Sequence, residues 1–167
     1  MSLEIPNPGA MLETVIRQEE MLRFERFAFD DAWRLGLLLR ERVLDHGGDA
    51  AMDITVGGVQ LFRCGAGVPT PNNGRWIRRK ANVVLENWKS SLRVMLEMTL
   101  KGRTPEEFGL RTEEFALSGG SFPLWVKGQG VIGAATVSGL PQTHDHQMVA
   151  DALAAYLDIG DAPSVLA

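Results

Sequence analysis

The sequence predicts an α+β fold in which helices cover an antiparallel β-sheet. Three observations support this prediction. The 18 glycines fall in clusters, the stretches between clusters carry apolar residues at helical spacing, and the β-rich runs come in pairs separated by short glycine turns. We expect the order helix, optional strand, helix, hairpin, helix, hairpin, helix. Paired strands between helices favour an antiparallel sheet, because a parallel sheet needs single strands alternating with helices.

Length and composition limit the classes of protein that need to be considered. We expect one domain over residues 1–167, with a flexible lead-in (1–9) and a flexible tail (158–167). The net charge of −4 and the absence of a Lys/Arg block argue against a nucleic-acid partner. A single cysteine, no charged-then-apolar leader and no bilayer-length apolar run predict a cytoplasmic protein without a membrane partner.

The first half of the chain predicts two helices and a hairpin. An amphipathic segment begins near Met11, and a second helix runs from Asp30, its expected N-cap, to His46. Its predicted core-facing side comprises Trp33, Leu37, Leu38, Val43 and Leu44. Two β-rich runs then flank the Gly57-Gly58 turn within residues 51–65.

The second half predicts a long helix, another hairpin and a final helix. Residues 68–74 are rich in Pro, Asn and Gly and are expected to form a loop. One uninterrupted helix is predicted over 75–101, followed by a short turn at Thr104-Pro105. Strands are predicted at 122–127 and 131–138, and a last helix runs from its expected cap, Thr143, to Leu157.

Residues 128–133 match G-x-G-x-x-G, the pattern of dinucleotide-binding turns. That pattern binds pyrophosphate only where it opens a helix, because the phosphates sit at the helix N-terminus. Here a β-branched run follows, which favours a hairpin turn.

His144, Asp145 and His146 form a second candidate motif. Imidazoles two residues apart on a helix point in different directions, so a shared metal ion would need an irregular turn. The alternative is that Asp145 stabilises the positive N-terminus of the last helix and the histidines fill surface or interface positions.

Residues 72–82 are the densest in groups that can bind a ligand. Arg75, Arg78, Arg79 and Lys80 follow the expected start of the long helix, where free N–H groups and cations can hold a carboxylate or phosphate. Lys80 borders the apolar face and is expected to be partly desolvated. The alternative is a solvated basic face with apolar stems packed on the protein.

The segment Ser118-Gly119-Gly120-Ser121 precedes a predicted strand. Such a loop allows close backbone approach to a ligand, and it also serves as a plain turn. Cys64 lies in a predicted strand and is expected to behave as a small apolar residue rather than a nucleophile.

The motifs at 119–124, 130–134 and 137–139, followed by Asp145 and Ala152-Leu153, resemble the GlcG/HbpS-like domain family. Trp76, Arg79-Lys80 and Asn82, with residues 13–24 as a lead-in, are similar to its cytosolic uncharacterised branch. The resemblance covers nearly the whole chain, and the C-terminal hairpin is its most specific part.

This resemblance implies a profilin-like or PAS-like fold with a five-stranded antiparallel sheet, and assembly into homo-oligomers. Some relatives outside this branch bind haem and have been described as haem-degrading. No haem ligand maps residue by residue onto this sequence, so haem is one candidate cofactor among others. Arg79, Lys80 and Asp145 are the residues for which the resemblance implies a functional position.

The sequence leaves three functions open. The first is binding of a small anion between the long helix and the C-terminal hairpin. The expected site residues are Trp76, Arg79, Lys80, Gly119, Gly120, Ser121 and Asp145. The second is an enzyme acting on a small anionic substrate or haem, in which Lys80 and Asp145 serve as base and acid. The third is a structural protein whose role is self-association.

Overall fold

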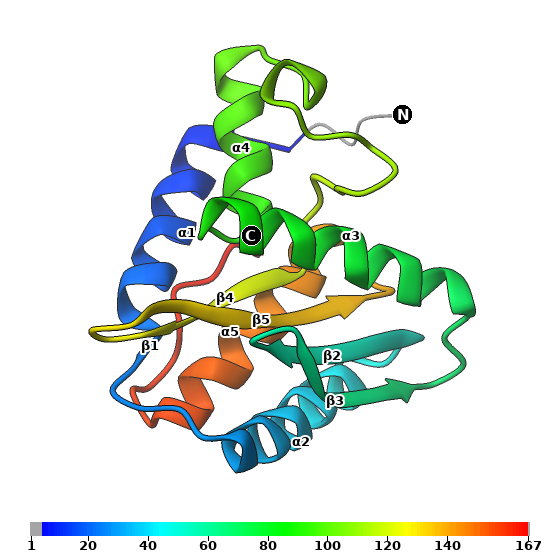
Figure 1. Ribbon diagram of the computed structural model, residues 1–167, viewed down its shortest axis with the longest axis vertical. Helices are drawn as coiled ribbons and strands as arrows, with labels where there is room; N and C mark the ends of the chain where they lie inside the picture. Colours follow the sequence, from blue (N-terminus) through cyan, green and yellow to red (C-terminus); the bar gives the residue numbers. More distant parts are fainter. Residues whose placement is uncertain (1–4, 167) are drawn as a thin grey trace.

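The computed structural model describes residues 5–166, which form three layers around a five-stranded sheet (Figure 1). Helix α3 (Pro71–Asn87) covers one face of the sheet, and helices α2 (Phe29–His46) and α5 (Gln142–Leu157) cover the other. Helices α1 (Pro8–Met21) and α4 (Ser91–Lys101) pack against each other beside the sheet. None of the helices within residues 5–166 has the length and apolar character that crossing a membrane requires.

The sheet has the strand order β1-β4-β5-β2-β3. Its strands are β1 (Arg23–Phe24), β2 (Ala50–Val56), β3 (Val59–Ala66), β4 (Ser121–Val126) and β5 (Gly130–Ser138). The two predicted hairpins, β2-β3 and β4-β5, are confirmed. Residues 127–129 form the second hairpin's turn, so the G-x-G-x-x-G segment leads into β5 instead of opening a helix. Strand β1 departs from the expected antiparallel pattern because it pairs parallel to β4, with Arg23 opposite Trp125.

The predicted helix over 75–101 is wrong in two respects. It begins at Pro71, where the N–H of Thr70 donates to the side-chain oxygen of Asn73. The loop before it therefore spans 67–70 and not the expected 68–74. It also breaks after Asn87: Trp88 adopts a left-handed conformation (φ 53°), and the Ser90 hydroxyl accepts from Arg93 N as the N-cap of α4. A hydroxyl that satisfies an orphan N–H favours a new helix start over a continuous helix.

Helix α2 differs from the prediction in its cap and in its buried face. It begins at Phe29, and Asp31, not Asp30, accepts a hydrogen bond from the N–H of Ala28. Its core-facing residues are Ala32, Leu35, Gly36, Leu39 and Val43. Of the side chains expected to face the core, Trp33 (60%), Leu37 (44%) and Leu44 (45%) are instead exposed, while Leu38 is partly buried against the core.

The start of α5 also differs from the prediction. The helix begins at Gln142 after Pro141, and Thr143 lies within its first turn instead of capping it. The Asp145 carboxylate accepts from the N–H groups of Gly139 and Leu140, which lead into the helix. This carboxylate therefore fixes the connection between β5 and α5.

The segment that follows α5 packs against α1 and α5. Val165 is buried with Val15, Leu92 and Leu96, and its N–H donates to the side chain of Gln147. At the other end of the described chain, Ile5 packs against the same cluster, while residues 1–4 and 167 of the expected lead-in and tail lie outside the described residues. Both ends thus contribute to one small core between α1 and α4.

Candidate functional site

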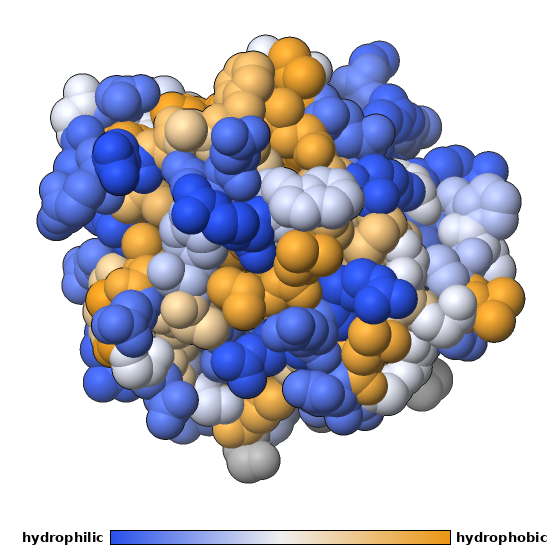
Figure 2. Space-filling model, turned by 90° about the horizontal axis from the view of Figure 1, so that it is seen from below, coloured by the Kyte–Doolittle hydropathy of each residue, from blue (hydrophilic) through white to orange (hydrophobic). Residues whose placement is uncertain are grey.

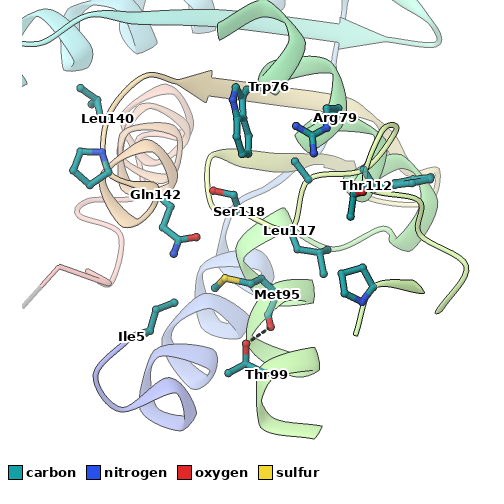
Figure 3. A pocket seen from close by; sticks show the side chains of 14 residues that line it. Ile5, Trp76, Arg79, Met95, Thr99, Thr112, Leu117, Ser118, Leu140 and Gln142 are labelled. Atoms are coloured by element: carbon teal, nitrogen blue, oxygen red, sulfur yellow. Dashed lines mark hydrogen bonds between the residues drawn. The ribbon is translucent and has the colours of Figure 1, made fainter. Parts of the chain in front are cut away.

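A cavity of about 750 Å³ lies between α3, α4, the loop that follows α4, and the start of α5 (Figure 3). Its apolar lining comes mainly from Ile5, Met95, Pro105, Phe115, Leu117 and Leu140. Its polar lining comes from Trp76, Arg79, Thr99, Thr112, Ser118 and Gln142. The volume is in the range of small-molecule sites, and a mostly apolar wall with few polar groups is their usual composition.

Arg79 is the cation of this cavity. Its guanidinium lies over the Trp76 ring, with Cζ 4.8 Å from the ring centroid, and both side chains extend from α3 into the cavity (Figure 3). Its Nε is buried and has no hydrogen-bond partner in the described part of the chain. Arg79 takes part in none of the ion pairs found among residues 5–166. Stacking orients the guanidinium and leaves its two terminal nitrogens available for a ligand.

The other polar lining groups add hydrogen-bond donors. The side-chain oxygen of Gln142 accepts from Gly119 N at 3.2 Å, and its NH2 group donates to no protein group in the described part of the chain. Ser118, on the loop that precedes β4, adds a hydroxyl to the lining near Gln142 (Figure 3). The described lining contains no Asp or Glu. The cavity is therefore suited to a ligand that supplies acceptor atoms and negative charge.

A smaller hollow of about 250 Å³ adjoins this cavity and shares Trp76, Ser118 and Leu140 with it. Lys80 and Asp145 contribute to its lining. The structure thus brings together the two residues whose meeting the sequence spacing could not establish.

Lys80 and Asp145 form a buried ion pair. Lys80 Nζ donates to Asp145 Oδ2 at 2.8 Å and to the carbonyl of Val137 at 3.2 Å, and the two side chains are only 3% and 2% exposed. Burial lowers the pKa of the Lys80 amine and raises the pKa of the Asp145 carboxyl, while the attraction between the two groups opposes both shifts. Asp145 also accepts from Gly139 N and Leu140 N, so its carboxylate is well satisfied.

Gly119, Gly120 and Ser121 line neither the large cavity nor the hollow. Gly120 has φ +124°, and a Cβ there would lie 2.5 Å from the Val137 carbonyl and 2.8 Å from Lys80 Nζ. The Ser121 hydroxyl is fully buried and pairs with Thr136 Oγ1 at 2.8 Å. In this chain Gly120 allows close packing around the Lys80–Asp145 pair, Gly119 allows close packing against the backbone of Gln142, and Ser121 is tied into the sheet.

The three histidines lie outside the cavity. The rings of His46 and His144 are in contact, with centroids 5.0 Å apart. His146 is fully buried, and its Nε2 lies 2.8 Å from Gln18 Oε1. His144 and His146 thus face different surroundings, and the described residues contain no group of three or more His, Cys, Asp or Glu arranged to hold a metal ion.

Other predicted cations lie elsewhere. Arg75 and Arg78 are exposed and do not line the cavity. The expected site at the helix start is also displaced, because α3 begins at Pro71 and Arg79 lies two turns inside it. Sequence reasoning missed Met95 and Phe115, because the helix break and the loop after α4 bring them to the cavity. It missed Gln142 because α5 begins one residue before the expected cap, Thr143.

The fold and cavity define a mixed α/β domain with a largely apolar pocket that carries the cation Arg79. A family model described as "Haem degrading protein HbpS-like" matches residues 27–154. The chain belongs to this HbpS-like family, as the resemblance of its motifs indicated. The expected five-stranded, helix-covered fold is likewise confirmed.

Individual relatives agree with this assignment. A UPF0303 protein of Rhizobium rhizogenes is 44% identical over 143 residues, covering 86% of this chain and 88% of the relative. The crystal structure of the Ybr137w protein matches with a TM-score of 0.82 and 29% identity, covering 89% of each chain. A structure titled "PduOC:Heme Complex" matches with a TM-score of 0.65 and 17% identity, covering 77% of this chain and 94% of that chain, and supports the fold alone.

Proposed function

We propose that this protein binds a small anionic molecule in the cavity beneath Trp76 and Arg79. The observation that carries the proposal is the Arg79 guanidinium, which is stacked on Trp76 and forms no ion pair with any residue in the described range. An anion bound in the cavity can accept from the terminal N–H groups of this cation, and hydrogen bonds between ionised groups are the strong ones. The absence of carboxylates from the described lining supports the same ligand charge.

Haem fits this cavity poorly as judged from its donor atoms. Haem iron in proteins is held by His, Cys, Met or Tyr side chains. The described lining offers only the thioether of Met95, while Tyr156 donates to Asp31 on α2 and Cys64 lies on β3. Although one structural neighbour is a haem complex, we therefore assign the cavity to an organic anion.

The structure supports anion binding better than it supports catalysis, because the Lys80–Asp145 pair that would act as base and acid is enclosed. Each group has hydrogen-bond partners within the protein, and almost no surface of either side chain is open to a substrate. A general base must come within hydrogen-bond distance of the proton that it removes. The enclosure of this pair favours a structural role, with the anion held nearby by Arg79.

We also propose that the protein self-associates through α2 and β3. Four exposed apolar side chains of α2, Phe29, Trp33, Leu37 and Leu44, lie at helical positions that share one side of the helix. Figure 2 views the side of the molecule on which α2 lies and shows apolar residues interspersed with charged ones. The adjacent β3 is an edge strand, so a second copy can pair with it about a twofold axis. We further infer a cytoplasmic location, which the lone Cys64 supports.

The anion proposal predicts ligand-dependent stabilisation that requires Arg79. Among acetate, phosphate, benzoate and octanoate, at least one should raise the thermal unfolding midpoint by roughly 5–10 °C at a concentration about 100 times Kd. Arg79→Gln should abolish the rise, and Arg78→Gln, at an exposed neighbour outside the cavity, should preserve it. No rise in the wild type, or a rise that persists in Arg79→Gln, would contradict the proposal.

The self-association proposal predicts a change in sedimentation. The wild type should sediment as a dimer or larger species, and Trp33→Glu should shift it to the monomer because a charge would be buried at the contact. Leu85→Glu, at an exposed apolar residue on α3, serves as the control and should leave the assembly intact. A monomeric wild type, or an unchanged Trp33→Glu assembly, would refute this interface.

A further inference from the structure

We infer that the ligand is a monocarboxylate with an apolar body, such as a medium-chain or aromatic acid. This inference rests on the anion-binding function proposed above and specifies the chemical class of the ligand. It follows from the charge, polarity and volume of the cavity.

The charge of the lining points to a single anionic group. Arg79 is the one cationic side chain among the described residues that line the cavity, and Lys80 is neutralised by Asp145 in the adjoining hollow. A second negative charge on the ligand would have no cation opposite it and would be desolvated at a cost. Phosphate and dicarboxylates therefore suit this lining less well than one carboxylate.

The shape of the anion receptor favours a carboxylate. A guanidinium presents parallel N–H donors that match the two oxygens of a carboxylate. The stack on Trp76 limits rotation of the Arg79 side chain, and the Gln142 NH2 group and the Ser118 hydroxyl are further donors of the lining.

The rest of the cavity favours an apolar body. Met95 on α4 lies across the cavity from Trp76 and Arg79, with Leu117 between them and Ile5 to one side (Figure 3). With Phe115 and Pro105 these side chains form a wall that offers no charge. A volume of about 750 Å³ far exceeds the needs of acetate, so an apolar chain or ring can replace water along this wall.

Isothermal titration with four sodium salts and one neutral analogue tests the ligand class. Octanoate should bind at least about tenfold more tightly than acetate, phosphate, suberate and octanamide. Acetate and phosphate lack the apolar body, the dicarboxylate suberate carries a second charge, and octanamide carries none. Arg79→Gln should reduce octanoate affinity to the level of octanamide, and Arg78→Gln should leave it unchanged. Met95→Gln should weaken octanoate and leave acetate unaffected.

The outcomes separate this inference from the function on which it rests. If acetate or phosphate binds as tightly as octanoate and depends on Arg79, the anion-binding function stands and the monocarboxylate inference is overturned. Tighter binding of suberate also overturns it. If no anion binds in an Arg79-dependent manner, both proposals fail. The expected ranking, with its loss in Arg79→Gln, supports both.

Discussion

Lys80→Met should lower the free energy of unfolding by about 3–5 kcal/mol, because it leaves the Asp145 carboxylate buried without its cation. Methionine keeps most of the side-chain volume, so the loss reports the charge and not a cavity. Urea denaturation of the wild type and the variant at pH 7 measures the difference, and an unchanged m-value shows that both unfold from an equally compact state.

Two further variants identify the cause of that loss. Arg78→Met removes an exposed cation from the same helix and should change the free energy of unfolding by no more than about 0.5 kcal/mol. The double variant Lys80→Met with Asp145→Asn should be more stable than Lys80→Met alone, because the buried charge is gone. A Lys80→Met protein as stable as the wild type would show that the ion pair contributes nothing to the fold.

Acidification should destabilise the wild type through His146. Burial lowers the pKa of this imidazole from 6.5 to about 3, and its only described polar partner is the neutral side chain of Gln18. Below pH 6.5 the imidazole of His146 is protonated in the unfolded chain, whereas in the folded state it stays neutral until about pH 3. The free energy of unfolding should therefore fall by ~1.4 kcal/mol per pH unit across this window, or about 2 kcal/mol between pH 6.5 and 5.

His146→Gln isolates this contribution, because glutamine offers Gln18 a neutral donor that does not titrate. Chemical denaturation at several values between pH 7 and 5 should give a shallower pH dependence for the variant, by the amount stated above, whatever its stability at pH 7. Parallel curves for the two proteins would mean that the folded state accepts the proton on His146, and the buried neutral imidazole would be refuted.

Much of the fold could be predicted because it depends on local pattern. Glycine turns flanked by β-rich runs specified both hairpins, and apolar spacing specified the helices on either side. The break at Trp88 could not be predicted in this way, because a tryptophan with positive φ is unfavourable. Its ring packs against Trp125, a contact distant in sequence. The Asn87 and Ser90 side chains, typical of helix ends, were its only local signal.

The site was predictable only in part. Family resemblance selected Arg79, Lys80 and Asp145, and all three lie at the cavity or the hollow beside it. Gly119, Gly120 and Ser121 lie at neither, because a glycine that accommodates a neighbouring side chain has the same sequence signature as one that accommodates a ligand. Whether a helix's apolar stripe faces the core or solvent is likewise decided by packing, as Trp33 illustrates.

The joint at residues 88–90 connects the two helices that form opposite walls of the cavity. Arg79 and Met95 stand on opposite sides of this joint, so the angle between α3 and α4 sets the separation of the cationic and apolar walls. Glu19 of α1 clamps α4 at the joint by accepting from Ser90 N at 2.8 Å and pairing with Arg93 at 2.7 Å. A bulky ligand that pushed α4 outward would strain this clamp. Glu19, which does not line the cavity, thus helps from α1 to hold the two walls at their observed separation.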